Sequence, residues 1–352
     1  MLALEALRHR YPNRRLELVS SGTAALQLAL SASRQSAQGV VALPAYACPD
    51  IATAAIGAGF RIELYDVDPN TLEPDFRSLE RCLRAGATHV LAVHLYGRLV
   101  HVAAIQDAAR QFGVTVIEDA AQHAGATRDG RRGGAFAPWS ILSFGRGKGI
   151  NAAGGGALLV QDDLSWQPPH LPEPPAAMRF VRLVTAIGTE LAAHPLLFGM
   201  ASRIPSLGVG KTEYQPPRPS TAMNPVSIEL LIEALTRDDE AVAHRRQVAT
   251  MYRERLAESP TNAFVPPTSV QEGALRFPIR LHREPGARAS GLGIVRSYPR
   301  TLLDYPEIRQ ALHSQPGPLP GAEELARTTY TLPTHERITA RLVDSIVEIL
   351  KE

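Results

Sequence analysis

The sequence has little of what would indicate a secreted, metal-binding or nucleic-acid-binding protein. Its 352 residues include two cysteines, Cys48 and Cys82, and neither belongs to a paired CxxC or a Cys/His zinc spacing. We therefore expect no disulfide framework and no metal site, and a reducing cytoplasm fits best. The 37 basic and 35 acidic residues leave a formal net charge of +2, which gives no electrostatic reason to expect nucleic acid or an anionic membrane as a partner.

A long uninterrupted apolar run is also missing. The most apolar stretch, residues 180–200, contains Arg182, Glu190 and Pro195, so we do not expect it to span a membrane. Its apolar stripe is more typical of a core or a dimer interface than of a docking helix for a membrane or a partner. Residues 1–15 are too charged for a secretory signal. These features favour a soluble globular protein.

The apolar periodicity of the N-terminal half alternates between helical and strand patterns. Helices are predicted at 23–33, 51–58, 79–85 and 103–112, and strands at 39–43, 62–67, 89–93, 114–117, 140–144 and 157–160. Strands separated by helices of this length imply βαβ crossovers. The predicted fold class is therefore α/β, with a mostly parallel central sheet flanked by helices.

The pattern changes between about residues 161 and 219, where prolines cluster. Three further elements are predicted after this segment: a long helix at 227–256, a short strand at 275–281 and a helix at 336–350. We therefore expect a large domain over residues 1–225, in which 161–219 is an atypical insertion-like segment. A smaller C-terminal α/β domain covers residues 226–352 and includes the long connecting helix.

The first of three chemical motifs is SSGTAAL at residues 20–26. A helix that begins here offers the free backbone N–H groups of its first turn, together with a hydroxyl and a glycine. Such a helix terminus can hold a phosphate. A plain Ser/Thr cap of the helix is the alternative interpretation.

The second motif is VIEDAAQ at residues 116–122. A buried strand ends in Asp119 at its carboxyl edge, where open α/β sheets bind ligands. An aspartate at this place can pair with a protonated ring nitrogen and keep a cofactor electron-withdrawing. Gln122, three residues later, can reach the same side. A helix-capping aspartate is the alternative.

The third motif is SFGRGK at residues 143–148. Lys148 follows a strand in a glycine-rich loop, so its amine can approach a ligand closely and act as a nucleophile. A solvated loop lysine is the alternative. A nucleotide P-loop is excluded, because no glycine stands five residues before Gly147 and Gly149 replaces the required Ser/Thr. The glycines also lack the dinucleotide-binding GxGxxG spacing.

In this order, SGTAAL, EDAAQ and SFGRGK resemble the three cofactor motifs of the DegT/DnrJ/StrS-type sugar aminotransferase family, which has the aspartate aminotransferase fold (fold type I). The resemblance extends to VVALPAY, YDVDPNTLEPD, AVHLYGRLV and LPGAEELARTTYTLP. It covers nearly the whole chain except about residues 161–219. It implies a pyridoxal-phosphate-dependent aminotransferase with a large and a small domain.

The resemblance implies a role for each residue that matches a motif. Lys148 would form the Schiff base with pyridoxal 5'-phosphate. Asp119 would bind the pyridine nitrogen, and Gln122 would bind the 3-oxygen of the ring.

The phosphate site is implied in the same way. Ser143 and the backbone at Gly22, Thr23 and Ala24 would hold the phosphate. Family members complete this site with an asparagine from the neighbouring subunit, and Asn224 is the candidate here. The resemblance therefore also implies a homodimer with a shared active site.

One position departs from the family pattern. The family stacks an aromatic ring on the cofactor at the position that counting back from Gly59 assigns to Cys48. Either Tyr46 supplies this ring instead, or a smaller group takes its place.

Four residues are candidates for substrate contacts. His94 and Tyr96 end a strand and can line the pocket, although a structural histidine is the plainer alternative. Arg296 and Tyr298 lie in a segment resembling the substrate-proximal YP stretch of the family. Together with Arg300 they could bind a carboxylate or a phosphate, and surface arginines are the alternative.

The resemblance implies that the enzyme takes an amino group from glutamate and transfers it to a keto-sugar nucleotide. Family members that deoxygenate sugars have lost the Schiff-base lysine to histidine, so Lys148 argues against a dehydratase-like reaction. A regulatory or scaffold protein that keeps the fold without turnover is a further alternative. The presence of Lys148, Asp119 and Gln122 together disfavours it.

Overall fold

The computed structural model describes residues 2–35, 38–175, 213–257, 262–264 and 270–351. The apolar stretch at 180–200 lies outside these residues. The main sheet has seven strands in the order β1-β9-β8-β5-β4-β2-β3. Their bounds are Arg14–Val19 (β1), Gly39–Pro44 (β2), Phe60–Tyr65 (β3), His89–Val93 (β4), Thr115–Asp119 (β5), Trp139–Ser143 (β8) and Gly156–Gln161 (β9).

Most neighbours in this sheet are parallel. Parallel pairing joins β3, β2, β4, β5 and β8 in turn, whereas β9 pairs antiparallel with both β8 and β1. The carboxyl ends of β4, β5 and β8 therefore meet at one edge of the sheet, which is where α/β folds bind ligands. The predicted α/β fold class with a mostly parallel central sheet is confirmed.

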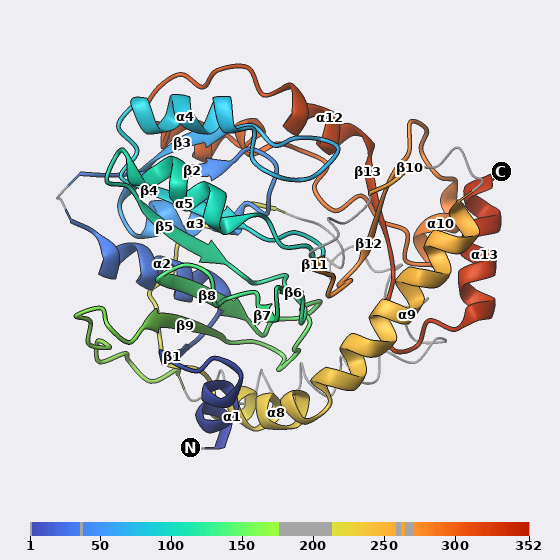
Figure 1. Ribbon diagram of the computed structural model, residues 1–352, viewed down its shortest axis with the longest axis horizontal. Coiled ribbons are helices and arrows are strands. Elements are labelled where there is room, and N and C mark those ends of the chain that lie inside the picture. The colour runs from blue at the N-terminus through green and yellow to red at the C-terminus, as the bar shows by residue number, and fades with distance from the viewer. Residues whose placement is uncertain (1, 36–37, 176–212, 258–261, 265–269, 352) are drawn as a thin grey trace.

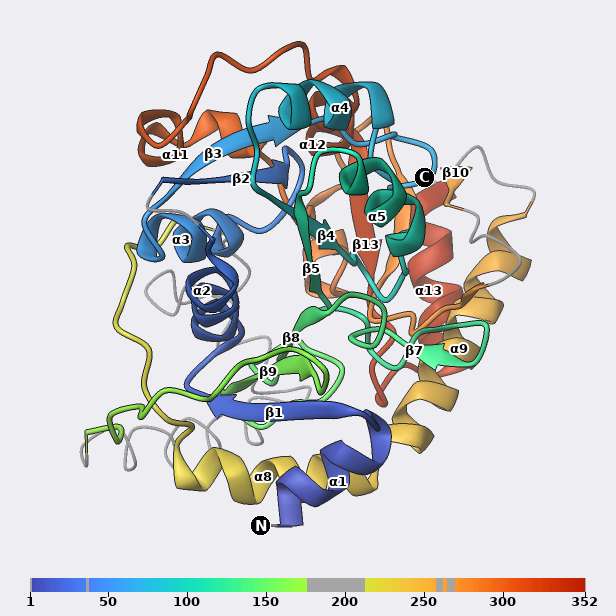
Figure 2. The ribbon, with the colours of Figure 1, turned by 60° about the vertical axis from the view of Figure 1, so that its left-hand side comes forward.

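Helices cover both faces of the main sheet (Figure 1, Figure 2). The four nearest are α2 (Gly22–Ser33), α3 (Asp50–Gly57), α4 (Phe76–Arg84) and α5 (Val102–Arg110). In β2, Val41 and Leu43 join the apolar cluster of α2 and α3, whereas Val40 and Ala42 join that of α4 and α5. Because side chains alternate along a strand, burial on both faces explains the continuous apolar runs in the sequence.

The C-terminal part adds two small sheets, β10-β12-β13 and β11-β6-β7. Their strands are Thr127–Arg128 (β6), Arg131–Arg132 (β7), Asn262–Ala263 (β10), Val270–Gln271 (β11), Phe277–Arg280 (β12) and Thr329–Leu332 (β13). The other helices of the described residues are α1 (Leu2–Arg10), α8 (Pro225–Thr236), α9 (Asp238–Leu256), α10 (Ala287–Gly291), η2 (Leu302–Asp304), α11 (Pro306–Gln310), α12 (Pro320–Thr328) and α13 (Ala340–Lys351). None of these helices is long and apolar enough to cross a membrane.

A second apolar core lies between α9, α13 and the strands β12 and β13 (Figure 1). Tyr252 of α9 packs there against Phe277, with ring centroids 5.3 Å apart, and Val343 of α13 joins the same cluster. A separate core of this kind is what a smaller C-terminal domain requires. The boundary at residues 225 and 226 stays a prediction.

The prediction of a single helix at 227–256 is wrong. Two helices, α8 and α9, meet at Arg237, whose φ of −101° and ψ of −1° interrupt the helical backbone. The break places Asp238 at the first turn of α9, where the positive end of the helix favours a carboxylate. Asp238 is 2% exposed, and three arginines have a guanidinium nitrogen within 4.0 Å of its carboxylate: Arg10, Arg132 and Arg245. Two of these ion pairs, with Arg10 and Arg132, are long-range, so the periodicity does not reveal them; together the three offset the cost of burying the charge.

A buried carboxylate at Glu118 joins β5 to both of its neighbours. It accepts hydrogen bonds from Nε2 of His94, just after β4, at 2.9 Å, and from the hydroxyl of Ser140 in β8 at 3.0 Å. Three backbone N–H groups also donate to it: those of Gly134, Phe136 and Ala137. Burial alone would raise the pKa of Glu118, but these hydrogen bonds outweigh it and lower the pKa to about 2.

Replacing this carboxylate should destabilise the fold. In Glu118→Gln, an amide NH₂ group would face N–H and O–H donors that hydrogen-bond to a carboxylate oxygen in the wild type. We therefore expect the free energy of unfolding to fall by about 3–5 kcal/mol. Urea titration at pH 7 measures this loss. Glu80→Gln, which removes an exposed pair with Arg84, is the control and should change the free energy by less than about 0.5 kcal/mol.

The pH dependence separates this ion from a general packing effect. Because the folded pKa lies below the usual 4.5, ionised Glu118 stabilises the fold above that pH, and the contribution is lost as the pH falls toward 2. The Glu118→Gln variant should lack this component of acid destabilisation. Identical pH profiles for the two proteins would contradict the assignment.

Candidate active site

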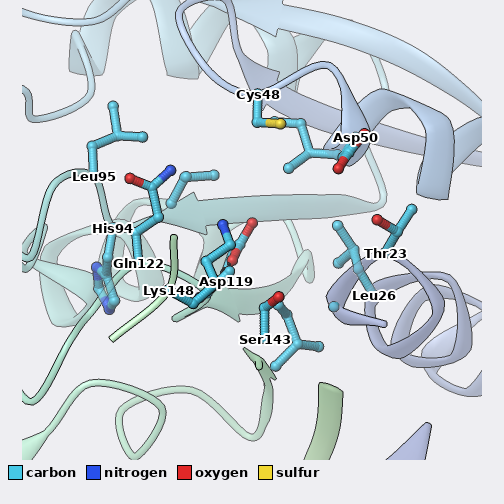
Figure 3. A pocket seen from close by; sticks show the side chains of 15 residues that line it. Thr23, Leu26, Cys48, Asp50, His94, Leu95, Asp119, Gln122, Ser143 and Lys148 are labelled. Carbon is cyan, nitrogen blue, oxygen red and sulfur yellow. Dashed lines mark hydrogen bonds between the residues drawn. The ribbon is translucent and has the colours of Figure 1, made fainter. Parts of the chain in front are cut away.

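A pocket opens at the carboxyl ends of β4, β5 and β8, beside the start of α2 (Figure 3). All three sequence motifs contribute to its lining: Gly22 and Thr23 from the first, Asp119 and Gln122 from the second, and Ser143 and Lys148 from the third. The fold therefore brings together segments that are far apart in the chain. Because a helix begins and three strands end here, backbone and side-chain polar groups converge on one space.

The start of α2 lies directly against the end of β8. A side chain at position 22 would place its Cβ 2.6 Å from the Cβ of Ser143, so only glycine allows this approach. Within the described residues, the N–H of Thr23 and the hydroxyl of Ser143 make no hydrogen bond and can donate to a phosphate. The N–H of Ala24, predicted to do the same, instead donates to the hydroxyl of Ser21 at 3.0 Å, which caps the helix.

Asp119 ends β5 and is 6% exposed. Its Oδ1 accepts the N–H of Ala121 at 2.9 Å, and its other oxygen makes no hydrogen bond within the described residues. Burial raises the pKa of Asp119, while the Ala121 N–H and the charge of Lys148 oppose that shift. A buried carboxylate with one unpaired oxygen is suited to bind a cation, such as a protonated ring nitrogen.

Lys148 lies in the loop between β8 and β9, and this loop is held through its backbone. A side chain at Gly149 would meet the Cα of Ala124 at 2.6 Å, so the loop packs closely on the segment that follows Gln122. Arg245 of α9 donates to the carbonyl oxygens of Gly149 and Ala124 at 3.5 and 3.1 Å. The half-buried Lys148 amine makes no hydrogen bond or ion pair within the described residues, so it is available to a ligand.

Cys48, and not Tyr46, lines the opposite wall of the pocket. Tyr46 is fully buried, and its hydroxyl lies 2.7 Å from that of Tyr96. Burial raises the pKa of Cys48 to about 12, which favours the neutral thiol over the nucleophilic thiolate. The wall at this point is therefore a small neutral group and not an aromatic ring.

Asp50 also lines the pocket, and the sequence analysis did not single it out. It begins α3 near Cys48 (Figure 3), and it is an exposed residue. The surrounding protein nevertheless partly desolvates the carboxyl of Asp50 and so raises its pKa, against the opposing effects of the Lys148 charge and of hydrogen bonds with Cys48 and Thr23. Its place in the sequence, at the start of a helix that follows a strand, is the signal that could have identified it.

His94 lines the pocket but uses both ring nitrogens within the protein. Its Nδ1 accepts the N–H of Val100 at 3.2 Å, so the ring proton is on Nε2 and is donated to Glu118. This arrangement favours the structural alternative for His94 over a substrate contact.

Four other candidates do not line the pocket of this chain: Tyr96, Tyr298, Arg296 and Asn224. Tyr96 and Tyr298 lie behind its wall, where both contact the side chain of Gln122. Arg296 is paired with a surface glutamate and stacks on a tyrosine ring. The side chain of Asn224 accepts the N–H of Val226 at 3.0 Å and so caps α8.

Known proteins are similar to the chain over most of its length. The sequence profile of the DegT/DnrJ/EryC1/StrS aminotransferase family matches residues 14–170 and 211–351. A dTDP-3-amino-3,4,6-trideoxy-alpha-D-glucose transaminase from Micromonospora megalomicea subsp. nigra is 28% identical over 349 residues, which are 95% of this chain and 84% of that protein. An L-glutamine:2-deoxy-scyllo-inosose aminotransferase from Streptomyces kanamyceticus is 32% identical over 143 residues, 41% of this chain and 34% of that protein.

Solved structures share the fold. A crystal structure of S. venezuelae DesV in complex with a ketimine intermediate has a TM-score of 0.77 at 22% identity, over 99% of this chain and 87% of that one. An E. coli GDP-4-keto-6-deoxy-D-mannose-3-dehydratase has a TM-score of 0.74 at 17% identity, over 100% and 92% of the two chains. At these identities the likeness concerns the fold.

The α/β fold and the lysine-containing pocket at the carboxyl edge of its sheet define an enzyme of the fold type I class. Within that class, the chain belongs to the DegT/DnrJ/EryC1/StrS aminotransferase family. The predicted family and the predicted aminotransferase activity are thereby confirmed. Pyridoxal phosphate is the cofactor typical of this family.

Asp119→Asn should stabilise the protein in the absence of ligands. The raised pKa means that ionising Asp119 costs folding free energy, and this cost grows as the pH rises above the usual value near 3.8. An amide keeps the acceptor for Ala121 without the charge. We expect a melting temperature higher by about 2 °C or more at pH 7, with the difference shrinking toward pH 4. Calorimetry of cofactor-free protein measures this, and a lower melting temperature would contradict it.

Proposed function

We propose that this aminotransferase binds pyridoxal phosphate in the pocket, with Lys148 as its covalent attachment point. We further propose that it moves an amino group from glutamate to a keto-sugar nucleotide. The family membership supports the reaction class, and the name of the Micromonospora megalomicea transaminase supports a nucleotide-linked sugar as the acceptor.

One observation carries the proposal: the Lys148 amine and one Asp119 oxygen, both unpaired within the described part of the chain, share a pocket with the start of α2. Each of these groups fits one part of pyridoxal phosphate. A phosphate matches the donors at Thr23 and Ser143. A protonated ring nitrogen matches Asp119, and a reactive carbonyl matches an uncommitted amine.

When bound, pyridoxal phosphate supplies an electron-withdrawing ring that stabilises negative charge on the substrate carbon. The carboxylate of Asp119 would hold a proton at the ring nitrogen, because ionised Asp119 otherwise lies buried without a second partner among the described residues. The amine of Lys148, whenever it is not covalently attached, could take up and return a proton at Nζ. Gly147 and Gly149 flank Lys148, so no neighbouring side chain in the sequence crowds its amine.

Three alternatives remain, and each predicts a different response to an amino donor. The structural likeness to a GDP-4-keto-6-deoxy-D-mannose-3-dehydratase raises a dehydratase-like reaction, and the presence of Lys148 argues against it. The Streptomyces kanamyceticus relative is named for L-glutamine, so glutamine is the second candidate donor. A scaffold protein without turnover would respond to neither.

The Lys148→Ala variant tests the site directly. Purified wild-type protein with added pyridoxal phosphate should absorb at roughly 400–430 nm, and the variant should lack this covalent band. Glutamate should move the wild-type band to about 330 nm, because the cofactor then carries the amino group. Absorbance spectra before and after addition of glutamate, or of glutamine in a parallel sample, measure both effects.

The outcomes separate the alternatives. A shift with glutamine alone would correct the donor and keep the reaction. A band that ignores both donors would point to another reaction on the same cofactor. Absence of any wild-type band with excess pyridoxal phosphate would overturn the proposal.

We also propose that the enzyme is a homodimer whose active sites are shared, with Asn224 completing the phosphate site of the partner. Asn224 caps α8 through its Oδ1, while its Nδ2 has no hydrogen-bond acceptor within the described residues. A buried amide donor left unpaired costs folding free energy, which supports a partner outside the single chain.

Mixed dimers of Lys148→Ala and Asn224→Ser subunits test the sharing. Serine keeps the helix cap and removes the amide donor. In a mixed dimer, one site would contain both Lys148 and the partner's Asn224, so it should regain tight cofactor binding that both parent dimers lack. Differently tagged subunits allow the mixed dimer to be isolated, and titration with pyridoxal phosphate at 400–430 nm measures binding. A monomer in sedimentation, or a mixed dimer no better than its parents, would contradict the arrangement.

A further inference from the structure

Both ends of the Gln122 amide are held by the protein. Its Oε1 accepts the backbone N–H of Tyr96 at 3.2 Å, and its Nε2 donates to the hydroxyl of Tyr298 at 2.5 Å. The backbone N–H of Tyr96 can only donate. A flipped Gln122 amide would place its NH₂ group against this N–H, so the orientation of the amide is fixed. One N–H of Gln122 is used by Tyr298, and the other has no acceptor within the described residues.

The Tyr96 end of this arrangement is fixed by the backbone. Tyr96 has a φ of 59°, a conformation that a bulky residue adopts only when its surroundings impose it. The next residue, Gly97, accepts the N–H of Gly273 at 2.8 Å, and a Cβ there would lie 2.5 Å from the N atom of Ala274. The turn is therefore pinned against the C-terminal part of the chain, and this aims the Tyr96 N–H at Gln122.

The Tyr298 end is fixed by ring packing. Tyr298 is 8% exposed, and its ring lies 5.5 Å from that of Tyr46 in an edge-on contact and 6.2 Å from that of Tyr96 in a stacked one. Its own segment is tied to β13, because Ser297 and Thr331 have their hydroxyls 3.1 Å apart. The hydroxyl of Tyr298 is therefore set in place before any ligand arrives.

We propose that Tyr298 is a positioning residue: by accepting one amide proton of Gln122, it presents the other to an anionic oxygen of the ligand in the pocket. The inference rests on the proposed function, since the ligand is taken to be pyridoxal phosphate. It gives Tyr298 a role different from the substrate contact expected from the sequence. It also makes the C-terminal segment a part of the cofactor site, although Tyr298 does not line the pocket.

Tyr298→Phe removes the hydroxyl and keeps the ring packing. The dissociation constant of pyridoxal phosphate, measured by absorbance titration, should rise about threefold to tenfold, because one orienting hydrogen bond is lost. Tyr252→Phe is the matched control, since it removes the hydroxyl of another buried tyrosine, which donates to the carbonyl of Pro333; neither residue lines the pocket. It should leave the dissociation constant within about twofold.

A double-mutant cycle distinguishes positioning from a structural effect. If Tyr298 acts through Gln122, then Tyr298→Phe should change the dissociation constant by less than about twofold in a Gln122→Ala background. The ratio of the bands near 330 and 420 nm should also shift in Tyr298→Phe and in Gln122→Ala alike, because both variants alter the hydrogen bond to the same ring oxygen.

Each outcome bears on one proposal. An unchanged dissociation constant in Tyr298→Phe, or an equal loss with and without Gln122, would overturn the positioning role. Wild-type protein that does not bind pyridoxal phosphate at all would instead overturn the proposed function. Melting temperatures of the wild type, of the three variants in the cycle and of Tyr252→Phe show whether each protein is folded.

Discussion

The site depends on how one buried carboxylate is satisfied. Glu118 gathers donors from His94 after β4, from Ser140 of β8 and from the turn that precedes β8, so it fixes the relative positions of three strand ends. Asp119 is the next residue, and successive side chains of a strand point to opposite faces. Once Glu118 is anchored on one face, the carboxylate of Asp119 is directed into the pocket on the other.

The two neighbouring carboxylates have opposite environments. Five donors lower the pKa of Glu118 to about 2, whereas burial with a single backbone donor raises that of Asp119. Ionised Glu118 stabilises the fold, whereas one carboxylate oxygen of Asp119 has no hydrogen-bond donor within the described residues. Buried polar groups in natural proteins are usually hydrogen-bonded. The exceptions occur mainly at sites where a bound ligand supplies the missing hydrogen-bond partner. The contrast between these adjacent residues therefore distinguishes the acid that the fold satisfies, Glu118, from the acid that is proposed to bind the cofactor, Asp119.

The sequence predicted most of what depends on local pattern and little of what depends on distant contacts. The strand before Asp119, the helix after Ser21 and the glycine-rich loop around Lys148 each carry a short-range signal, so the main sheet and three of the pocket walls could be predicted. The break at Arg237 and the contact of Tyr298 with Gln122 depend on partners far along the chain, which periodicity does not encode. Asp50 was missed because an acidic residue at a helix start has a sufficient local explanation.

Arg245 shows why the freedom of Lys148 is itself a product of long-range packing. A charged residue of α9 would ordinarily be assigned to the solvent-exposed face. Arg245 is nevertheless only 7% exposed, and its guanidinium donates to carbonyls of Gly273, Ala124 and Gly149. These contacts fix the backbone of the lysine loop against two other segments. Because the loop is held through its carbonyl groups, no side-chain ion pair is needed to keep Lys148 in place. The amine is thus positioned and still uncommitted, which is the combination that covalent attachment to a carbonyl group requires.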